Sequence, residues 1–333
     1  MKAKRIDGQA VNGSRNVLAE VLPLDTPYAI TIFPIYACNF KCNYCLHSLE
    51  KEKRGHVSSV VSMDLDLYKK CIDDISHFPN KLKVLHFIGY GEPLLHKDIV
   101  KMVEYAVDRN VANTVDIVTN GSLLTPQLSR ALINAGLSSL RISLQGLNST
   151  KYKEVCDVKI DYAKFIENIR YFYENRGNTR VHIKIIDTGL KDFEDQDFIN
   201  KFSNICDTIA VEHLVPVIDK INYTNNSFGK NQLGNEISHC EICPQPFYFM
   251  QINPDGKCVP CCNGDIPIYL GDCKTESANK IWNNIQSNSF RRMHLKKEKS
   301  INQICSSCKQ YIYSMYPEEI LDNDCDALLK FYE

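Results

Sequence analysis

Three cysteines near the amino terminus stand at a spacing that suits an inorganic cofactor. They are Cys38, Cys42 and Cys45, which form a Cys-x3-Cys-x2-Cys loop after an apolar, strand-like run. Cubic iron–sulfur clusters are held by cysteine thiolates and normally take four of them. A loop that supplies three therefore leaves one iron open to another ligand, and an open iron is a place where chemistry can occur.

Two other interpretations of this loop stay open. Zinc sites are usually built from two pairs of ligands or from a full set of four, and the nearest nitrogen ligand here is His47. Reduced, buried cysteines need no metal, but they rarely fall three to a loop. Neither interpretation explains an open fourth position.

The loop resembles the signature of the radical S-adenosylmethionine (radical SAM) enzymes, in which an aromatic residue precedes the last cysteine, as Tyr44 does here. The resemblance implies that Cys38, Cys42 and Cys45 hold a 4Fe–4S cluster whose open iron binds S-adenosylmethionine. It also implies reductive cleavage of S-adenosylmethionine to a 5′-deoxyadenosyl radical, with a flavodoxin- or ferredoxin-type electron donor. The cofactors then carry the difficult chemistry, and the protein binds, orients and excludes water.

Length and composition predict a cytoplasmic protein with one large and one smaller domain. A chain of 333 residues exceeds what one core usually serves. The net charge of −1 argues against partners such as nucleic acid or anionic membranes, which need a basic surface. No stretch approaches the ~20 apolar residues of a membrane span, and no apolar segment follows the basic residues 1–8. The fifteen cysteines are therefore expected to be metal ligands and reduced thiols.

Short β-rich runs alternate with helical patterns from residue 28 onward, which predicts βα units around a parallel sheet. We expect an α/β fold, a partial (β/α)6 TIM-like barrel, followed by a small cysteine-rich domain of a β-hairpin plus a helix. The expected strands are 29–35, 83–88, 114–118, 139–143, 180–186 and 208–215. The expected helices are 63–76, 97–109, 126–135, 162–175 and 193–202.

Polar and glycine-rich segments follow four of these strands. In parallel α/β folds the active site gathers at the carboxyl ends of the strands. The cysteine loop follows the first strand, and residues 89–93, 119–121 and 143–146 follow the next three. The sequence therefore predicts that these segments converge on one site.

The segment after the second strand resembles the Gly-Gly-Glu-Pro segment with which radical SAM enzymes bind the amino group of S-adenosylmethionine. The match is Tyr90-Gly91-Glu92-Pro93, with tyrosine in the place of the first glycine. The two glycines at 89 and 91 are expected to let a ligand approach the backbone. Read alone, the segment is also compatible with a plain βα turn.

The resemblance further places Asn120 and Ser143 at the ribose or carboxylate of S-adenosylmethionine, although each is also typical of a turn or strand end. Candidates for acid–base chemistry are Asp187, Glu212 and His213, with Lys184 on the fifth strand. Because residues alternate faces along a strand, Glu212 and His213 cannot both point inward. A solvated rim position is the alternative for each of them.

The carboxyl-terminal third carries a second set of cysteines. An Asp255-Gly256 turn predicts a β-hairpin that returns the chain and brings Cys261 beside Cys243. Together with Cys305 and Cys308, these thiolates would complete a closed cluster site. A structural zinc at the same four cysteines is the alternative. The expected division is an arm at 1–24, the barrel at 25–219, a polar linker at 220–239 and the auxiliary domain at 240–333.

This region resembles the twitch form of the SPASM domain, the auxiliary-cluster module of many radical SAM enzymes. Besides the four cysteines, the pieces that match are Cys243-Pro244, the Asp255-Gly256 turn and the Ile281-Trp282 pair. Only Cys325 follows the last pair, so the resemblance implies one auxiliary 4Fe–4S cluster. The remaining cysteines of this region are not assigned as ligands; they are Cys240, Cys258, Cys262, Cys273 and Cys325. Of these, Cys262 is a candidate hydrogen-atom donor.

A radical generator beside an electron acceptor suits oxidation. If the substrate radical lies next to a hydroxyl group, loss of a proton to a positioned base and of an electron to the auxiliary cluster gives a ketone. The leading hypothesis is therefore oxidation of a secondary alcohol on a sugar or cyclitol. The alternative is radical modification of a ribosomally made peptide, by epimerisation or by thioether or crosslink formation. A non-catalytic iron–sulfur or zinc protein would not need Glu92, Asn120 and Ser143 around an open iron.

Overall fold

The computed structural model describes residues 2–6, 15–55, 57–191, 194–218, 220–223 and 229–332. Within these ranges the strands form one ten-stranded sheet in the order β1-β7-β6-β5-β4-β3-β2-β8-β9-β10. Parts of the predicted arm (1 and 7–14) and of the predicted linker (224–228), and the first residue of the predicted helix 193–202, lie outside the described residues.

The six predicted barrel strands are confirmed, and neighbours among them pair in parallel. Two of them, the first and the sixth, end three residues earlier than predicted. The first stops before Pro34, which has no N–H for the ladder, and the sixth stops at Glu212 because the N–H of His213 donates to the Gln232 carbonyl instead. The strands are β2 (Ala29–Ile32), β3 (Val84–Phe87), β4 (Val115–Thr119), β5 (Ser139–Leu144), β6 (Arg180–Ile186) and β7 (Thr208–Glu212).

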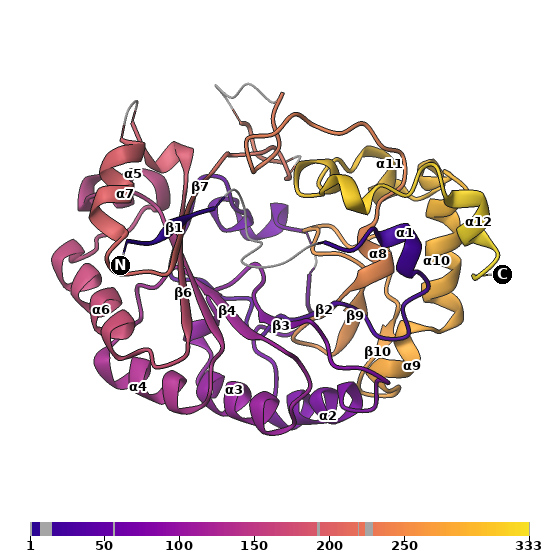
Figure 1. Ribbon diagram of the computed structural model, residues 1–333, viewed down its shortest axis with the longest axis horizontal. Coiled ribbons are helices and arrows are strands. Elements are labelled where there is room, and N and C mark those ends of the chain that lie inside the picture. Colours follow the sequence, from indigo (N-terminus) through magenta and orange to yellow (C-terminus); the bar gives the residue numbers. More distant parts are fainter. Residues whose placement is uncertain are drawn as a thin grey trace.

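The five predicted helices are also present, and Figure 1 shows α2, α3, α4 and α6 along the outer side of the curved sheet. Proline and a capping side chain start α4, where the Thr125 hydroxyl accepts from the N–H of Leu128. The helices are α2 (Leu65–Ile75), α3 (Ile99–Asp108), α4 (Pro126–Asn134), α6 (Tyr162–Asn175) and α7 (Asp195–Phe202).

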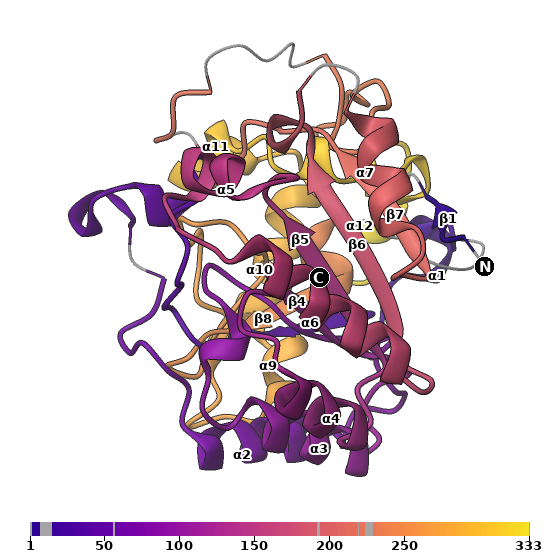
Figure 2. The ribbon, with the colours of Figure 1, turned by 90° about the vertical axis from the view of Figure 1, so that its left-hand side faces the viewer.

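Helix α5 (Ser149–Cys156) was not predicted. Its eight residues include three lysine or glutamate side chains, and an eight-residue helix spans too few turns for a clear periodic pattern. The Asn148 side chain caps its start by accepting from the N–H of Lys151 at 2.9 Å. Figure 2 shows the arrow of β6 pointing toward the end of the molecule where α5 and α11 (Gln303–Ser307) lie.

The predicted hairpin of the carboxyl-terminal region is confirmed, but it extends the barrel sheet. Strand β8 (Phe249–Ile252) pairs in parallel with β2, and β9 (Lys257–Val259) returns against β8 after a turn in which Gly256 has a φ of 86°. The other elements of this region are α8 (Gln245–Tyr248), β10 (Gly271–Asp272), α9 (Ala278–Trp282), α10 (Ile285–Leu295) and α12 (Cys325–Leu329). The short 3₁₀ helices are η1 (Leu46–Ser48), η2 (Lys51–Lys53), η3 (Pro93–Leu95), η4 (Asp187–Gly189), η5 (Lys299–Ile301), η6 (Tyr311–Tyr313) and η7 (Pro317–Glu319).

Two elements of the amino-terminal segment pack at different places, one at an edge of the sheet and one against the carboxyl-terminal segment. Strand β1 (Lys4–Arg5) pairs in parallel with β7 at one edge of the sheet. Helix α1 (Leu18–Val21) packs its Leu18 in an apolar cluster with Leu321 and Leu328 of the carboxyl-terminal segment. In the part of the chain that is described, no helix has the length and apolar character needed to cross a membrane.

The hydrophobic core lies between the sheet and its outer helices. Substitution of Phe87, a residue of this core, tests how much the core packing contributes to stability. Its ring is fully buried and contacts the Tyr68 ring of α2, with centroids 5.9 Å apart. We expect Phe87→Ala to lower the free energy of unfolding by about 3–5 kcal/mol through lost burial and a residual cavity. The measurement is the thermal unfolding midpoint of anaerobically purified protein. Ile285→Ala is the control, because this side chain is 78% exposed and its loss should leave the midpoint nearly unchanged.

Candidate active site

The cysteine loop is held in place by the helix that the sequence did not reveal. The N–H groups of Lys41 and Asn43 donate to the last carbonyls of α5, those of Cys156 and Val155, at 3.0 and 2.8 Å. The N–H of Cys45 donates to the Cys42 carbonyl at 2.9 Å, so the loop closes in a turn. These bonds also satisfy carbonyls that a helix end otherwise leaves without partners.

The three loop cysteines are half-buried, and their surroundings favour the neutral thiol. Burial raises the pKa of Cys38 to about 12 and that of Cys45 to about 11. Metal ligation needs the thiolate, so binding of a cationic iron centre at this loop must release protons.

Tyr44 connects the loop to the end of β5. Its hydroxyl donates to Oε1 of Gln145, and Nε2 of Gln145 donates to the Ser143 carbonyl at 3.2 Å. The aromatic residue of the cysteine loop therefore orients the loop against the segment that follows the fourth predicted strand.

Glu92 is buried, at 2% exposure, and its carboxylate binds the protein itself. Oε1 accepts from the Thr119 hydroxyl at 2.6 Å and from the N–H of Leu94 at 3.0 Å, and Oε2 accepts from the N–H of Asn120 at 2.8 Å. Burial raises the pKa of Glu92, although these three donors act in the opposite direction. The side chain thus joins the ends of β3 and β4, while contact of this segment with S-adenosylmethionine stays a prediction.

The two glycines around Tyr90 are required by contacts within the chain. A Cβ on Gly91 would lie 1.9 Å from the Ile35 carbonyl oxygen, and one on Gly89 would lie 2.1 Å from the Phe33 ring. We expected these glycines to admit a ligand. The structure instead shows the backbone of this loop packed against the segment that leads from β2 into the cysteine loop.

Asn120 belongs to a closed group of polar side chains at the end of β4. Its Nδ2 donates to Oδ1 of Asn39 at 2.9 Å, and Nδ2 of Asn39 donates to the Ser122 hydroxyl at 2.8 Å. The Ser122 hydroxyl in turn donates to Oδ1 of Asn120 at 2.6 Å. Because Asn39 follows Cys38, this group ties the cysteine loop to β4.

The acid–base candidates separate into two pairs. Lys184 and Glu212 form an ion pair of 2.6 Å on β6 and β7, and their side chains are only 14% and 6% exposed. Ser143 is the register partner of Lys184 on β5, so it lies beside this pair on the same face. His213 and Asp187 form a second pair of 3.0 Å, with side chains 42% and 39% exposed, at the rim.

The inner face of the sheet carries charged residues that sequence reasoning missed. The outward residues of the strands belong to the apolar core, so the alternate positions face away from the helices. Asp116 pairs there with His86 at 2.7 Å and with Arg141 at 3.1 Å. Burial acts to raise the pKa of Asp116, but Arg141 and His86 hold it below its usual range. Single charged residues between apolar neighbours, as in Val115-Asp116-Ile117 and Leu140-Arg141-Ile142, were the available signal.

His182 lies on the same face of the sheet, on β6, and one nitrogen of its ring has no hydrogen-bond partner among the described residues. Its Nδ1 lies 2.9 Å from the Thr208 hydroxyl, whereas Nε2 is buried and has no hydrogen-bond partner among the described residues. Burial lowers the pKa of His182 to about 4, so the ring is neutral near pH 7. A neutral imidazole offers one donor and one acceptor, which suits a hydroxylated ligand.

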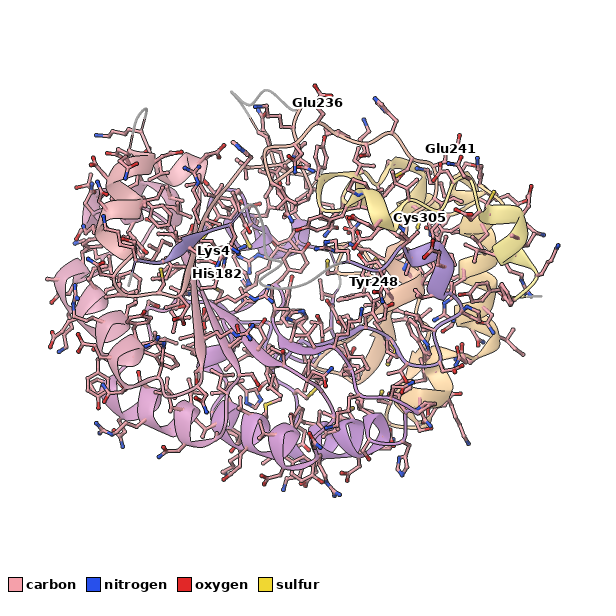
Figure 3. The ribbon with its side chains drawn as sticks, viewed as in Figure 1. Lys4, His182, Glu236, Glu241, Tyr248 and Cys305 are labelled. Atoms are coloured by element: carbon pink, nitrogen blue, oxygen red, sulfur yellow. The ribbon has the colours of Figure 1, made fainter. Side chains whose placement is uncertain are left out.

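The four predicted auxiliary cysteines come together around one cavity. Cys243 precedes α8, Cys261 follows β9, and Cys305 and Cys308 belong to α11 and its end; Figure 3 labels Cys305 at this helix. The Asn302 side chain caps α11 by accepting from the N–H groups of the first turn, which orients Cys305. Among the described residues no three His, Cys, Asp or Glu side chains meet at a single-ion position.

Most other cysteines of this region have partners away from that cavity. The Cys240 thiol lies 3.2 Å from the Met315 sulfur, and the Cys258 and Cys273 sulfurs are 3.3 Å apart in the core. Cys325 donates to the Asp322 carbonyl. Cys262 differs, because its sulfur accepts from Nε2 of Gln310 at 3.2 Å, and Gln310 lines the cavity of the four auxiliary cysteines.

Two family models match the chain. The radical SAM superfamily model covers residues 32–202, just over half of the chain, and the SPASM model, an iron–sulfur cluster-binding domain, covers residues 243–309. These matches contain all seven cysteines that we assigned to the two sites.

Two curated relatives match parts of the chain. One, from Pyrococcus furiosus, is the tungsten-containing aldehyde ferredoxin oxidoreductase cofactor-modifying protein, 34% identical over 110 residues, which are 33% of this chain and 28% of the relative. The other is the PqqA peptide cyclase of Rhodopseudomonas palustris, 30% identical over 148 residues, which are 44% of this chain and 37% of the relative. The chain thus spans less than two fifths of the length of either.

Two solved structures share the fold. BtrN, in complex with AdoMet and 2-DOIA, has a TM-score of 0.54 and 18% identity over 86% of this chain and 97% of that one. SuiB of Streptococcus suis, bound to the precursor peptide SuiA, has a TM-score of 0.63 and 16% identity over 80% of this chain and 67% of that one. These likenesses concern the fold, and the two family models show that this chain belongs to the radical SAM superfamily and carries a SPASM auxiliary-cluster domain.

Proposed function

We propose that this radical SAM enzyme oxidises a secondary alcohol of a sugar or cyclitol. The observation that supports the proposal most directly is the buried Lys184–Glu212 pair beside Ser143 on the inner face of the sheet. It places a carboxylate and an amine at the carboxyl ends of β6 and β7, where the active sites of parallel α/β folds lie.

The residues present fit the cofactors of this family, a 4Fe–4S cluster with S-adenosylmethionine and auxiliary iron–sulfur binding. Cys38, Cys42 and Cys45 stand on one loop, and thiols of this kind are the usual ligands of such clusters. When bound, the cluster and S-adenosylmethionine supply the 5′-deoxyadenosyl radical. We assign the loop around Gly91, with Asn120 and Ser143, to the binding of S-adenosylmethionine.

The polar inner face supplies what a hydroxylated substrate needs. After a hydrogen atom leaves the carbinol carbon, the hydroxyl proton must pass to a base within hydrogen-bond reach. Glu212 is the proposed base, and Lys184 holds its carboxylate in place. The buried Nε2 of His182, which has no hydrogen-bond partner among the described residues, can bind a further hydroxyl group, because buried polar sites favour ligands that satisfy them.

The second electron of the oxidation must leave the substrate radical for a ketone to form. Cys243, Cys261, Cys305 and Cys308 surround a cavity that fits an auxiliary cluster by the chemistry of its donors. Tyr90 contacts both loops, because its carbonyl oxygen lies 2.9 Å from Nε2 of His47 and its hydroxyl lies 3.5 Å from the position that a Cβ on Gly264 would take. In this proposal Glu212 would take the proton, and an auxiliary cluster held by these four cysteines would accept the electron.

Modification of a peptide is the second candidate. PqqA peptide cyclase and peptide-bound SuiB are among the proteins this chain resembles. In that case the Cys262 thiol, whose sulfur accepts from Nε2 of Gln310, is the candidate donor of a hydrogen atom to a substrate radical, which would give epimerisation. The fate of a deuterium label distinguishes the two candidates.

A substrate deuterated at the carbinol carbon tests the proposal. Deuterium should appear in 5′-deoxyadenosine and a ketone should form, as measured by mass spectrometry. Glu212→Gln should lower ketone formation by roughly 10²–10⁴-fold, because the base is lost, while cleavage of S-adenosylmethionine continues. His213→Gln, at the rim, is the control and should retain turnover. Deuterium transfer only from peptide substrates would exclude alcohol oxidation in favour of the second candidate.

Iron content tests the ligand assignment. Anaerobically reconstituted protein should contain about eight irons, and replacement of the three loop cysteines by alanine should leave about four. Cys308→Ala should likewise disturb the auxiliary iron, since its sulfur lines the cavity. Cys240→Ala is the matched control and should retain about eight irons. If Cys240→Ala loses iron and Cys308→Ala does not, the auxiliary ligands are wrongly assigned.

A further inference from the structure

Helix α10 forms part of the wall of the cavity that the auxiliary cysteines surround. Phe290 and His294 stand one turn apart on this helix, and both line the cavity. Nε of Arg291 donates to the Pro246 carbonyl at 2.9 Å, which holds α10 against α8; Figure 1 shows these two helices as neighbours. The four cysteines assigned as ligands belong to other segments, so ligation does not explain this part of the wall.

His294 is buried, and one nitrogen of its ring lacks a partner. The residue is 2% exposed, and its Nδ1 has no hydrogen-bond partner among the described residues. The Phe290 ring meets the imidazole edge to face, with centroids 4.9 Å apart, and so restricts the orientation of the imidazole. Because buried polar groups of native proteins nearly always have hydrogen-bond partners, an unpaired nitrogen beside a cavity indicates a partner inside that cavity.

The other polar groups of this cavity suit an occupant that is negatively charged and accepts hydrogen bonds. Nδ2 of Asn263 donates to the Cys308 sulfur at 3.4 Å, and the lining includes Lys299. Among the described residues, no carboxylate lines the cavity. A 4Fe–4S cluster with four thiolate ligands carries a net negative charge, and its sulfurs accept hydrogen bonds. The lining therefore matches such a cluster, with the imidazole of His294 as a further donor.

We propose that His294 donates a hydrogen bond from its ring to a sulfur of the auxiliary cluster, either a sulfide or a cysteine Sγ, and thereby raises the reduction potential of that cluster. An imidazole carries at least one N–H whether it is neutral or protonated. A hydrogen bond to sulfur stabilises the additional negative charge of the reduced cluster, so it favours reduction. His294 acts on the reaction through the cluster and is a positioning residue.

The inference deepens the proposed alcohol oxidation and rests on it, because that reaction delivers one electron to the auxiliary site in each turnover. The substrate radical gives this electron to the oxidised auxiliary site and its hydroxyl proton to Glu212, and a ketone remains. The proton of His294 stays on its ring, so electrons and protons balance in the step. A raised potential makes the auxiliary site a better acceptor for the electron.

A redox titration of the reconstituted holoenzyme without substrate, followed by electron paramagnetic resonance, tests the proposal. His294→Phe removes the N–H and keeps an aromatic ring beside Phe290. We expect this variant to retain about eight irons. The equilibrium constant for reduction of its auxiliary cluster should fall about tenfold, a shift of about 59 mV to lower potential for one electron. The variant without the three loop cysteines shows which signal belongs to the auxiliary cluster.

Two further variants separate the hydrogen bond from other effects. His294→Gln keeps an N–H donor and should recover most of the lost potential. His77→Phe makes the same substitution at an exposed position outside the cavity and should leave both potentials unchanged. In His294→Phe the potential of the cluster at the cysteine loop should also stay unchanged, because Cys38, Cys42 and Cys45 do not line this cavity.

The wild type offers a second measurement that needs no variant. With isotope-labelled histidine, pulsed electron paramagnetic resonance should detect a weak coupling between a ring nitrogen and the reduced auxiliary cluster. Among the described residues that line the cavity, His294 is the one histidine, so the coupling is assigned to it. Absence of this coupling would overturn the proposal, as would an unchanged potential in His294→Phe with full iron content. A strong coupling, or loss of the auxiliary iron in both His294 variants, would make the residue a ligand and overturn the proposal too.

The measurements also separate this proposal from the proposed reaction. Because they contain no substrate, failure of the alcohol hypothesis leaves the measured potentials intact. Conversely, ketone formation by a His294→Phe variant with an unchanged potential would remove only the role of His294.

Discussion

The parallel pairing of β8 with β2 is the constraint on which the rest of this structure depends. Ala29 to Ile32 stand in register with Phe249 to Ile252, so the auxiliary domain continues the barrel sheet. The cysteine loop follows β2, and Cys261 follows the hairpin that β8 begins. Both sites are therefore set by the hydrogen bonds of one sheet. A flexible connection between separate domains could not hold two redox sites at a fixed separation.

Direct contact between the two loops follows from this pairing. A Cβ on Gly264 would lie 2.8 Å from the Leu46 side chain and 3.5 Å from the Tyr90 hydroxyl. Gly264 is close in sequence to Cys261, and Leu46 follows Cys45. The auxiliary loop thus needs a glycine to approach the cysteine loop this closely, and the Tyr90 hydroxyl lies at this contact.

The sequence was informative where a short pattern of neighbouring residues determines the local structure. The six barrel strands were predicted because apolar, β-branched runs alternate with helical patterns, and the cysteine loop was found because its spacing is local. The auxiliary set, spread over residues 243–308, was found through the Asp255-Gly256 turn and the resemblance to the SPASM domain. Helix α5 was missed because eight residues show too little periodicity, although the cysteine loop rests on it. The pairing of β8 with β2 joins segments more than 200 residues apart, and the sequence of neither strand indicates which strand it pairs with.

The charged inner face was missed for a different reason. Asp116, Arg141 and His182 each look like an isolated polar interruption of an apolar strand, which a single sequence cannot distinguish from a destabilising or solvated position. Only the register of β4, β5 and β6 shows that they share one face and that Asp116 and Arg141 pair. The functional meaning of a strand residue therefore depends on neighbours that are distant in the chain.

The tyrosine that replaces a family glycine also has a physical explanation. Positions 89 and 91 admit no side chain, because a Cβ at either one would collide with the Phe33 ring or with the Ile35 carbonyl. Tyr90 stands in a bend between these two glycines, and its hydroxyl lies 3.5 Å from the position that a Cβ on Gly264 would take. The loop thus keeps glycine where its own backbone requires it and gains a large aromatic side chain where the two cysteine sites face each other.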